Sequence, residues 1–321
     1  MRRPSTSTHR TALLPGPHAP PPAVSAKANR AIPFRVAAAE AALRVHALTD
    51  AQLHYGYALA DAPDHATCVD IQLALARLHN RSEATEAADR ALESAVETAN
   101  AVAEPSMAAA LQLRVQLAMA RHWITSARID PAAALLRALA PRIEAAPITQ
   151  RLDALEIRAD LLQAQNGDAE EVLRLLAQAI TLCEQDGAAM ARMAVLHVRT
   201  ARTALGMDDR AIAIDASRLE MKVRERADDA LQRAIPLLEA LAQPGDLALA
   251  LVLRAQLHAA RADHVSAERD LQRARKLGMR SGHLPATRAA LAGLAALATS
   301  TGDTAAAAQW RSEDEAHAQE A

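Results

Sequence analysis

The chain has 321 residues, of which about a quarter are alanine, 51% are hydrophobic and only 2% are aromatic. Alanine and leucine are strong helix formers and strand-favouring aromatics are almost missing, so the composition predicts an all-α protein and excludes a sheet-rich one. The formal net charge is −2, with 36 basic and 38 acidic residues. No global field attracts the chain to nucleic acid or to an anionic membrane, and neither is expected as a partner.

The two cysteines, Cys68 and Cys183, lie far apart in the sequence and form no C-x-x-C pair. This spacing is typical of a reducing compartment and excludes a disulfide framework or a cysteine-based zinc site. No apolar run approaches the roughly 18 residues that a membrane span needs. We therefore expect a cytoplasmic protein without a transmembrane segment.

Residues 1–33 differ in composition from the rest of the chain. They hold seven of the 15 prolines, several Ser and Thr residues, and basic residues without any acid before Glu40. Such a segment has too little apolar surface to offset its ordering entropy, so a disordered basic tail is predicted over 1–33.

Two kinds of export signal are alternative interpretations of this tail. A secretory signal needs an unbroken apolar core, whereas the apolar residues from Ala12 to Leu14 run into Pro15. The acid-free, Ser/Thr/Pro-rich composition is similar to the amino-terminal address of type III effectors, so an exported effector with a helical binding domain stays open as the alternative function.

From about residue 34 to 318 the apolar residues recur at spacings of three and four, which predicts amphipathic helices. Breaks with Gly, Pro or a capping side chain arrive every 15 to 20 residues or so, as at Glu104-Pro105, Asp186-Gly187 and Ser281-Gly282. The breaks predict about fourteen helices joined by short loops.

An internal repeat appears when the helices are aligned. Four segments share a Leu-x-x-Arg pattern with apolar flanks, and their arginines recur at intervals of about 40 to 55 residues: Leu111–Leu117, Leu155–Leu161, Leu196–Arg202 and Leu251–Leu257. A two-helix unit that returns at this spacing is the signature of an α-solenoid, in which each hairpin buries its apolar face against its neighbours.

The repeats resemble the tetratricopeptide (TPR) superfamily, in its MalT-like variety. The unit from Leu247 to Leu277 matches best, with small residues where the family packs helices closely, and the scheme repeats forty or so residues later: Ala255, Ala267, Ala274, Ala295 and Ala307. The resemblance implies a right-handed α-solenoid of about six or seven helical hairpins that binds other proteins.

The sequence contains no constellation of catalytic residues. A Gly-rich phosphate loop, a G-x-S-x-G elbow, an H-E-x-x-H motif and a Rossmann fingerprint are all missing. The 12 histidines are scattered, and His258 and His264 are six residues apart with no convergent carboxylate. We therefore expect no enzyme, no cofactor and no metal site, although an enzyme of unrecognised type remains a third alternative.

The recurrent arginines are the candidate partner-binding residues: Arg114, Arg158, Arg199 and Arg254. None has an acidic residue three or four positions away on its own helix, so each must find a partner elsewhere. One hypothesis is an ion pair with an adjacent helix. The other is a row of cations along the concave groove that contacts the carboxylates of a protein or peptide partner.

The longest interval between the arginines includes about fourteen extra residues, roughly 206–220. Such an insertion projects from one face of a repeat array, as a longer hairpin or as a specificity element. The predicted function is thus a non-catalytic protein-interaction module, a bacterial regulatory or scaffold protein whose concave groove binds an acidic partner segment.

Overall fold

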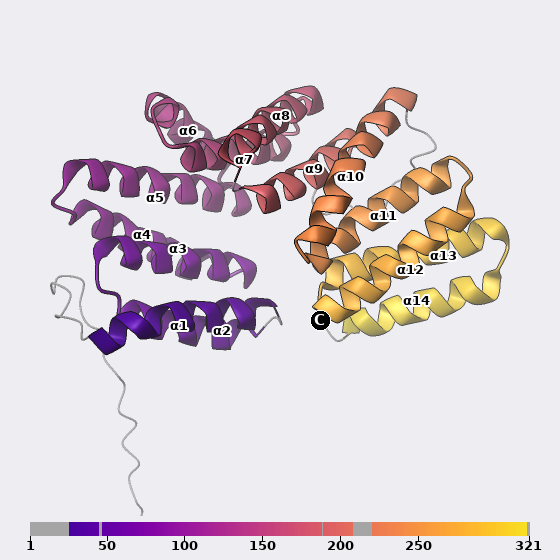
Figure 1. Cartoon of the computed structure of the whole chain (residues 1–321), viewed down its shortest axis with the longest axis horizontal. Helices are drawn as coiled ribbons and strands as arrows, with labels where there is room; N and C mark the ends of the chain where they lie inside the picture. Colours follow the sequence, from indigo (N-terminus) through magenta and orange to yellow (C-terminus); the bar gives the residue numbers. More distant parts are fainter. Residues whose placement is uncertain (1–25, 45–46, 188, 208–219, 320–321) are drawn as a thin grey trace, which may run out of the picture.

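The computed structural model describes residues 26–44, 47–187, 189–207 and 220–319, and this part of the chain contains helices and their connections without a strand. The expected all-α class is confirmed (Figure 1). The fourteen helices are α1 (Ala26–Arg44), α2 (Leu48–Ala60), α3 (His65–Arg81), α4 (Thr85–Asn100), α5 (Pro105–Thr125), α6 (Ile129–Glu144), α7 (Ile148–Ala164), α8 (Ala169–Asp186), α9 (Met190–Ala204), α10 (Met221–Ala240), α11 (Pro244–Ala260), α12 (His264–Ser281), α13 (Leu284–Thr301) and α14 (Thr304–Gln319).

The ends of the helical region differ slightly from the sequence-based boundaries. Helix α1 begins at Ala26 rather than near residue 34, and it contains Pro33 in its interior. The tail predicted over residues 1–33 is therefore helical from residue 26 on, whereas residues 1–25 lie outside the described residues, as do positions 208–219 of the predicted insertion. Helix α10, which is rich in charged residues, begins at Met221.

The helix ends follow from local chemistry. Pro105 occupies the first turn of α5, where its missing N–H is not needed, and the Glu104 carboxylate accepts hydrogen bonds from the backbone N–H groups of Ser106 and Met107. Gly187 ends α8, and Gly282 ends α12, in the left-handed conformation that glycine adopts without a steric penalty. The breaks predicted from the sequence are therefore real helix termini.

Each helix packs against the next one in the chain, and further contacts join alternate helices. In the described region, the main contacts between alternate helices join α3 with α5, α5 with α7, α9 with α11 and α11 with α13. All of these are odd-numbered. Because helices lie closest on the inner side of a curved stack, we call α3, α5, α7 and α9 the inner layer.

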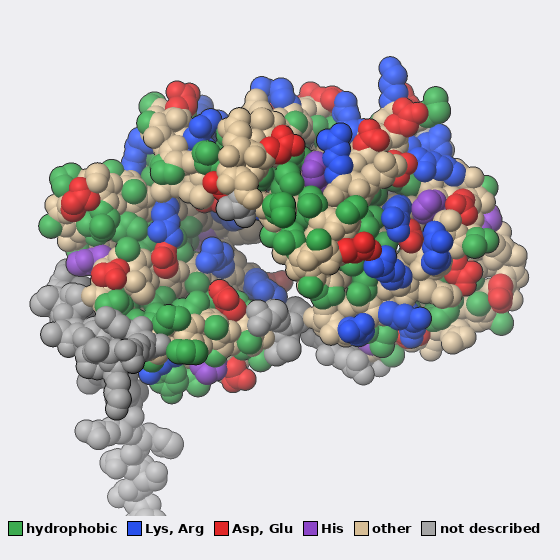
Figure 2. All heavy atoms as spheres, in the orientation of Figure 1, with side chains coloured by type: hydrophobic (Ala, Val, Ile, Leu, Met, Phe, Trp, Pro, Cys, Tyr) green, Lys and Arg blue, Asp and Glu red, His purple; other side chains and the backbone are tan. Residues whose placement is uncertain are grey.

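The helices follow one another along an arch, with α6 and α8 on its outer edge and α7 and α9 nearer the centre (Figure 1). Figure 2 shows a hollow between the amino-terminal helices on the left and the carboxy-terminal helices on the right. None of the helices in the described ranges is both long and apolar enough to cross a bilayer.

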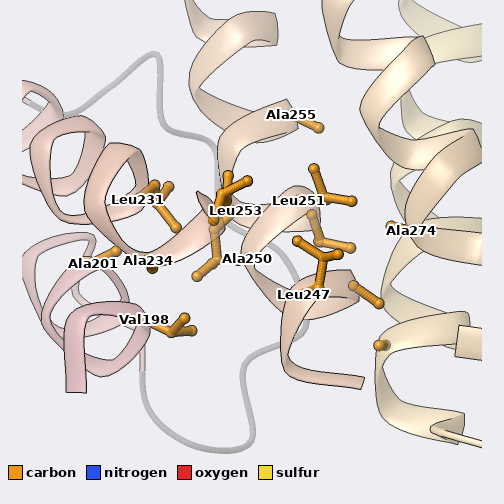
Figure 3. Packing of buried hydrophobic residues seen from close by; sticks show 14 of the residues in the cluster. Val198, Ala201, Leu231, Ala234, Leu247, Ala250, Leu251, Leu253, Ala255 and Ala274 are labelled. Atoms are coloured by element: carbon orange, nitrogen blue, oxygen red, sulfur yellow. The ribbon is translucent and has the colours of Figure 1, made fainter. Parts of the chain in front are cut away.

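The core is divided into five clusters of buried apolar side chains along the chain. The largest cluster joins α9 to α13 and alternates leucines with alanines (Figure 3). The small residues that the repeat pattern placed at close helix contacts are all buried: Ala255, Ala267, Ala274, Ala295 and Ala307. Small side chains at these positions let neighbouring helices approach closely.

One glycine marks the tightest of these approaches. A Cβ atom on Gly278 of α12 would lie 2.5 Å from the Thr287 hydroxyl oxygen and 3.0 Å from the Thr287 backbone nitrogen on α13. Backbone cannot move aside as a flexible side chain can, so α12 and α13 reach this separation only because residue 278 has no side chain.

Helix α14 carries a run of acidic residues, two of which pair with the preceding helices. The Arg275 side chain of α12 donates a hydrogen bond of 2.6 Å to Glu313 and lies over the Trp310 ring, 5.3 Å from its centroid. The Arg288 side chain of α13 donates a bond of 3.0 Å to Asp314. These pairs attach the last helix to both preceding ones.

Candidate functional site

The four candidate arginines lie on α5, α7, α9 and α11, which are equivalent odd-numbered helices, but their surroundings differ. Arg114 of α5 pairs with Asp70 of α3, and both side chains remain substantially exposed, at 37% and 54%. An ion pair with this exposure contributes little to stability because water screens it and the side chains lose entropy on pairing. Arg114 is therefore held only weakly.

Arg199 of α9 belongs to a larger charged network within the inner layer. It pairs with Asp160 of α7 and lies 3.8 Å from the Glu156 carboxylate. Arg192 donates to Asp153 at 2.6 Å and also to Glu156. Arg121 of α5 approaches Glu156 at 3.6 Å, so the acids of α7 link α5 with α9.

Burial acts on this network as well as charge. Burial, the largest cause, raises the pKa of the Asp160 carboxyl, although the positive charges of Arg199 and Arg121 oppose it. The sequence signal for the network is the spacing of Asp153, Glu156 and Asp160, which places three carboxylates on one face of α7. Their partners on α5 and α9 have no comparable signal.

Arg254 of α11 pairs within its own hairpin. Its Nε and Nη2 atoms donate hydrogen bonds of 2.7 and 2.9 Å to the two carboxylate oxygens of Asp270 on α12. Asp270 is only 2% exposed. This bidentate pair is a buried strut between the two helices of the hairpin, which is the arrangement of the ion-pair hypothesis.

Arg158 of α7 is different from the other three. Its side chain makes no hydrogen bond or ion pair with the described residues and instead lines a pocket of about 530 Å³ between α6, α7 and α8. The structure therefore does not arrange the four arginines as one uniform row. Two pair across the inner layer, one braces a hairpin, and Arg158 faces a pocket.

A buried polar cluster around His122 was missed by the sequence analysis. His122 is 1% exposed, and its Nδ1 lies 2.6 Å from the Asn80 Oδ1 atom. The Arg128 Nη2 atom lies 2.7 Å from His122 Nε2 and 2.7 Å from Asp89 Oδ1. Because the Asn80 amide oxygen accepts, Nδ1 carries a proton and donates to it, whereas Nε2 lies between the Arg128 guanidinium and the Asp89 carboxylate, whose Oδ1 atom is 3.1 Å away.

Burial of this cluster favours the neutral imidazole. Burial, the largest cause, lowers the pKa of His122, Asp89 opposes that shift, and the charge of Arg128 adds to it. A second proton on Nε2 could be donated to Asp89, but it would also lie close to an Arg128 N–H group and would place a second positive charge in a buried site. His122 is therefore a structural residue that favours the folded state when uncharged.

A pH dependence of stability follows from this neutral histidine. Below the usual histidine pKa of about 6.5, the unfolded chain binds a proton that the folded chain excludes, so the free energy of unfolding should fall between about pH 7 and 5. His79 and His197, whose pKa values burial also lowers, contribute in the same direction. Urea unfolding at several pH values should show a shallower decline for His122→Gln than for the wild type, and an equal slope would contradict the assignment.

The other groups considered for chemistry form no site. No cluster of three or more potential metal ligands occurs among the residues that the structure describes. The expectation that no carboxylate converges on His258 is wrong, because its ring lies 3.5 Å from Asp263 and 3.8 Å from Asp270; these are contacts within the α11–α12 hairpin beside Arg254. Cys68 and Cys183 are both free thiols.

Comparisons with known proteins give similarities to solved structures. No family model matches the sequence, and no curated protein matches it. Among solved structures, the chain is similar to the crystal structure of BtubC (BKLC) from P. vanneervenii, with 13% sequence identity and a TM-score of 0.40 over 92% of each chain. We draw no conclusion about binding or activity from a similarity of this size.

Proposed function

We propose that this chain is a non-catalytic protein-interaction module, a cytoplasmic bacterial regulatory or scaffold protein of the TPR-like class. In this proposal the helices form a right-handed α-solenoid of six or seven hairpins, and the inner layer binds an acidic segment of a protein partner. Two observations support the proposal: the hollow between the two arms of the arch (Figure 2), and the partly exposed ion pairs of the inner layer.

The solvent exposure of each ion pair decides which arginines can contact the partner's carboxylates. Arg114 and Asp70 are exposed enough for a partner carboxylate to compete with Asp70 at little energetic cost. Arg199, at 21% exposed, is the second contact that we assign to the partner. Arg254 is committed to a buried carboxylate and does not belong to the partner surface in this proposal.

The test compares removal of a positive charge from an inner-layer helix with removal of one from α4. Arg114→Ala removes an inner-layer cation, and Arg90→Ala is the matched control, because Arg90 lies on α4 at 71% exposure in a single weak pair with Glu86. The intact chain, immobilised and incubated with extract of the cells that make it, should retain a partner that raised salt releases. Arg114→Ala should retain several-fold less of it, and Arg90→Ala an unchanged amount.

Two results would contradict the proposal. One is that the intact wild-type chain retains no protein above the level of an unrelated helical protein. The other is that Arg114→Ala and Arg90→Ala retain the partner equally well while their circular dichroism spectra match the wild type.

A further inference from the structure

A pocket of about 530 Å³ lies between α6, α7 and α8. This volume is in the range of small-molecule sites rather than of a groove for a protein segment. Its apolar walls include Ile143 of α6, Leu155 of α7 and Leu182 of α8, and its polar lining includes Arg151 and Arg158. The pocket therefore combines apolar surface with two cations.

The two arginines lie along one face of α7. At 3.6 residues per turn, Arg151, Leu155 and Arg158 share a stripe, and Asp153 and Glu156 lie on the opposite side of the helix. The side chain of neither arginine has a hydrogen bond or ion pair with the described residues. The pocket is thus separate from the charged network of the inner layer.

The order of groups along α7 is a cation, an apolar side chain and a second cation. Arg151 and Arg158 are about two helical turns apart, which is about 10 Å along the axis. Leu155 lies between them, and Ile143 and Leu182 cover the same space from the neighbouring helices. A complementary ligand has an anion at each end and an apolar middle of similar length.

We propose that this pocket binds a linear α,ω-dicarboxylate with an aliphatic middle. One carboxylate accepts hydrogen bonds from the Arg151 guanidinium and the other from Arg158, and the methylene groups pack on Leu155. Glu144 also lines the pocket, and its carboxylate repels either end of the ligand. The site lies outside the partner surface of the proposed function, so the two proposals fail independently.

Calorimetric titration of the intact chain with suberate tests this proposal. Suberate has two carboxylates separated by six methylene groups, octanoate has the same carbon count with one carboxylate, and 1,8-diaminooctane has cations instead. Suberate should bind at least about tenfold more tightly than octanoate, because the second charge-assisted contact is lost in octanoate. 1,8-Diaminooctane should not bind.

Substitutions locate the binding. Arg151→Ala and Arg158→Ala should each weaken suberate about tenfold, to the level of octanoate. Arg174→Ala on α8 is the control, since Arg174 is 59% exposed and pairs with Glu171 on its own helix, and suberate affinity should not change. Glu144→Gln should strengthen suberate binding, because it removes the repelling charge.

The proposal is overturned if wild-type chain binds suberate no better than octanoate, if it binds neither, or if Arg158→Ala leaves suberate affinity unchanged. Circular dichroism confirms that each variant is folded. The comparison of suberate with octanoate on the wild-type chain decides the question even where a variant does not fold.

Discussion

Replacing Arg254 by alanine should lower the free energy of unfolding by about 3 kcal/mol. The change removes both donors that bind the Asp270 carboxylate, at 2.7 and 2.9 Å, and leaves a group that is 2% exposed without its guanidinium partner. A buried carboxylate without a partner is costly because neither water nor protein replaces the lost hydrogen bonds. Urea unfolding followed by circular dichroism measures the effect.

Two controls separate this strut from ordinary loss of charge. Arg114→Ala breaks an exposed pair and should cost less than about 1 kcal/mol. Removing both partners, with Arg254→Ala and Asp270→Ala together, should recover part of the loss because no buried charge is left unpaired. Equal costs for Arg254→Ala and Arg114→Ala would contradict the assignment of Arg254 as a buried strut.

Leu251→Ala should lower the free energy of unfolding by about 2–5 kcal/mol, the range for deleting a buried leucine side chain. Leu251 is fully buried in the largest cluster, and its side chain points from α11 toward Ala274 on α12 (Figure 3). Alanine at residue 274 is too small to fill the space, so a cavity remains where two helices meet.

The matched control is Leu53→Ala on α2, where the leucine is 52% exposed. This change should alter the free energy of unfolding by less than about 1 kcal/mol, since little buried surface is lost. The same urea titration compares the two variants. A loss for Leu251→Ala as small as that for Leu53→Ala would show that α11 is not packed as described.

Sequence patterns predicted the helices and their close contacts because both depend on local chemistry. Pro105 and Gly282 mark helix ends through backbone geometry alone, and buried alanines such as Ala274 recur wherever helices approach. The start of the first helix was placed too late because the tail was bounded by its composition over residues 1–33, whereas α1 begins at Ala26 and accommodates Pro33 in its interior.

The partners of the arginines could not be predicted, because they depend on how helices cross. Arg158 and Arg199 share the same Leu-x-x-Arg pattern, yet one lines a pocket and the other pairs with Asp160. The buried residues of α7 form two stripes, which leave two solvent-accessible faces on opposite sides of the helix. The Leu-x-x-Arg motif alone therefore does not determine what an arginine on one of these faces contacts. The buried His122 cluster could not be predicted for the same reason, since Asn80 and Asp89 come from other helices.

Carboxyl footprinting of the intact chain, alone and with its captured partner, tests the proposed partner surface most directly. Asp70 and Asp153 of the inner layer are 54% and 42% exposed, whereas Glu86 and Glu170 on α4 and α8 are 93% and 70% exposed and serve as references. We predict that the bound partner lowers labelling of Asp70 and Asp153 several-fold and leaves Glu86 and Glu170 unchanged. Unchanged labelling of Asp70 and Asp153, with protection of Glu86 or Glu170 instead, would contradict binding on the inner layer.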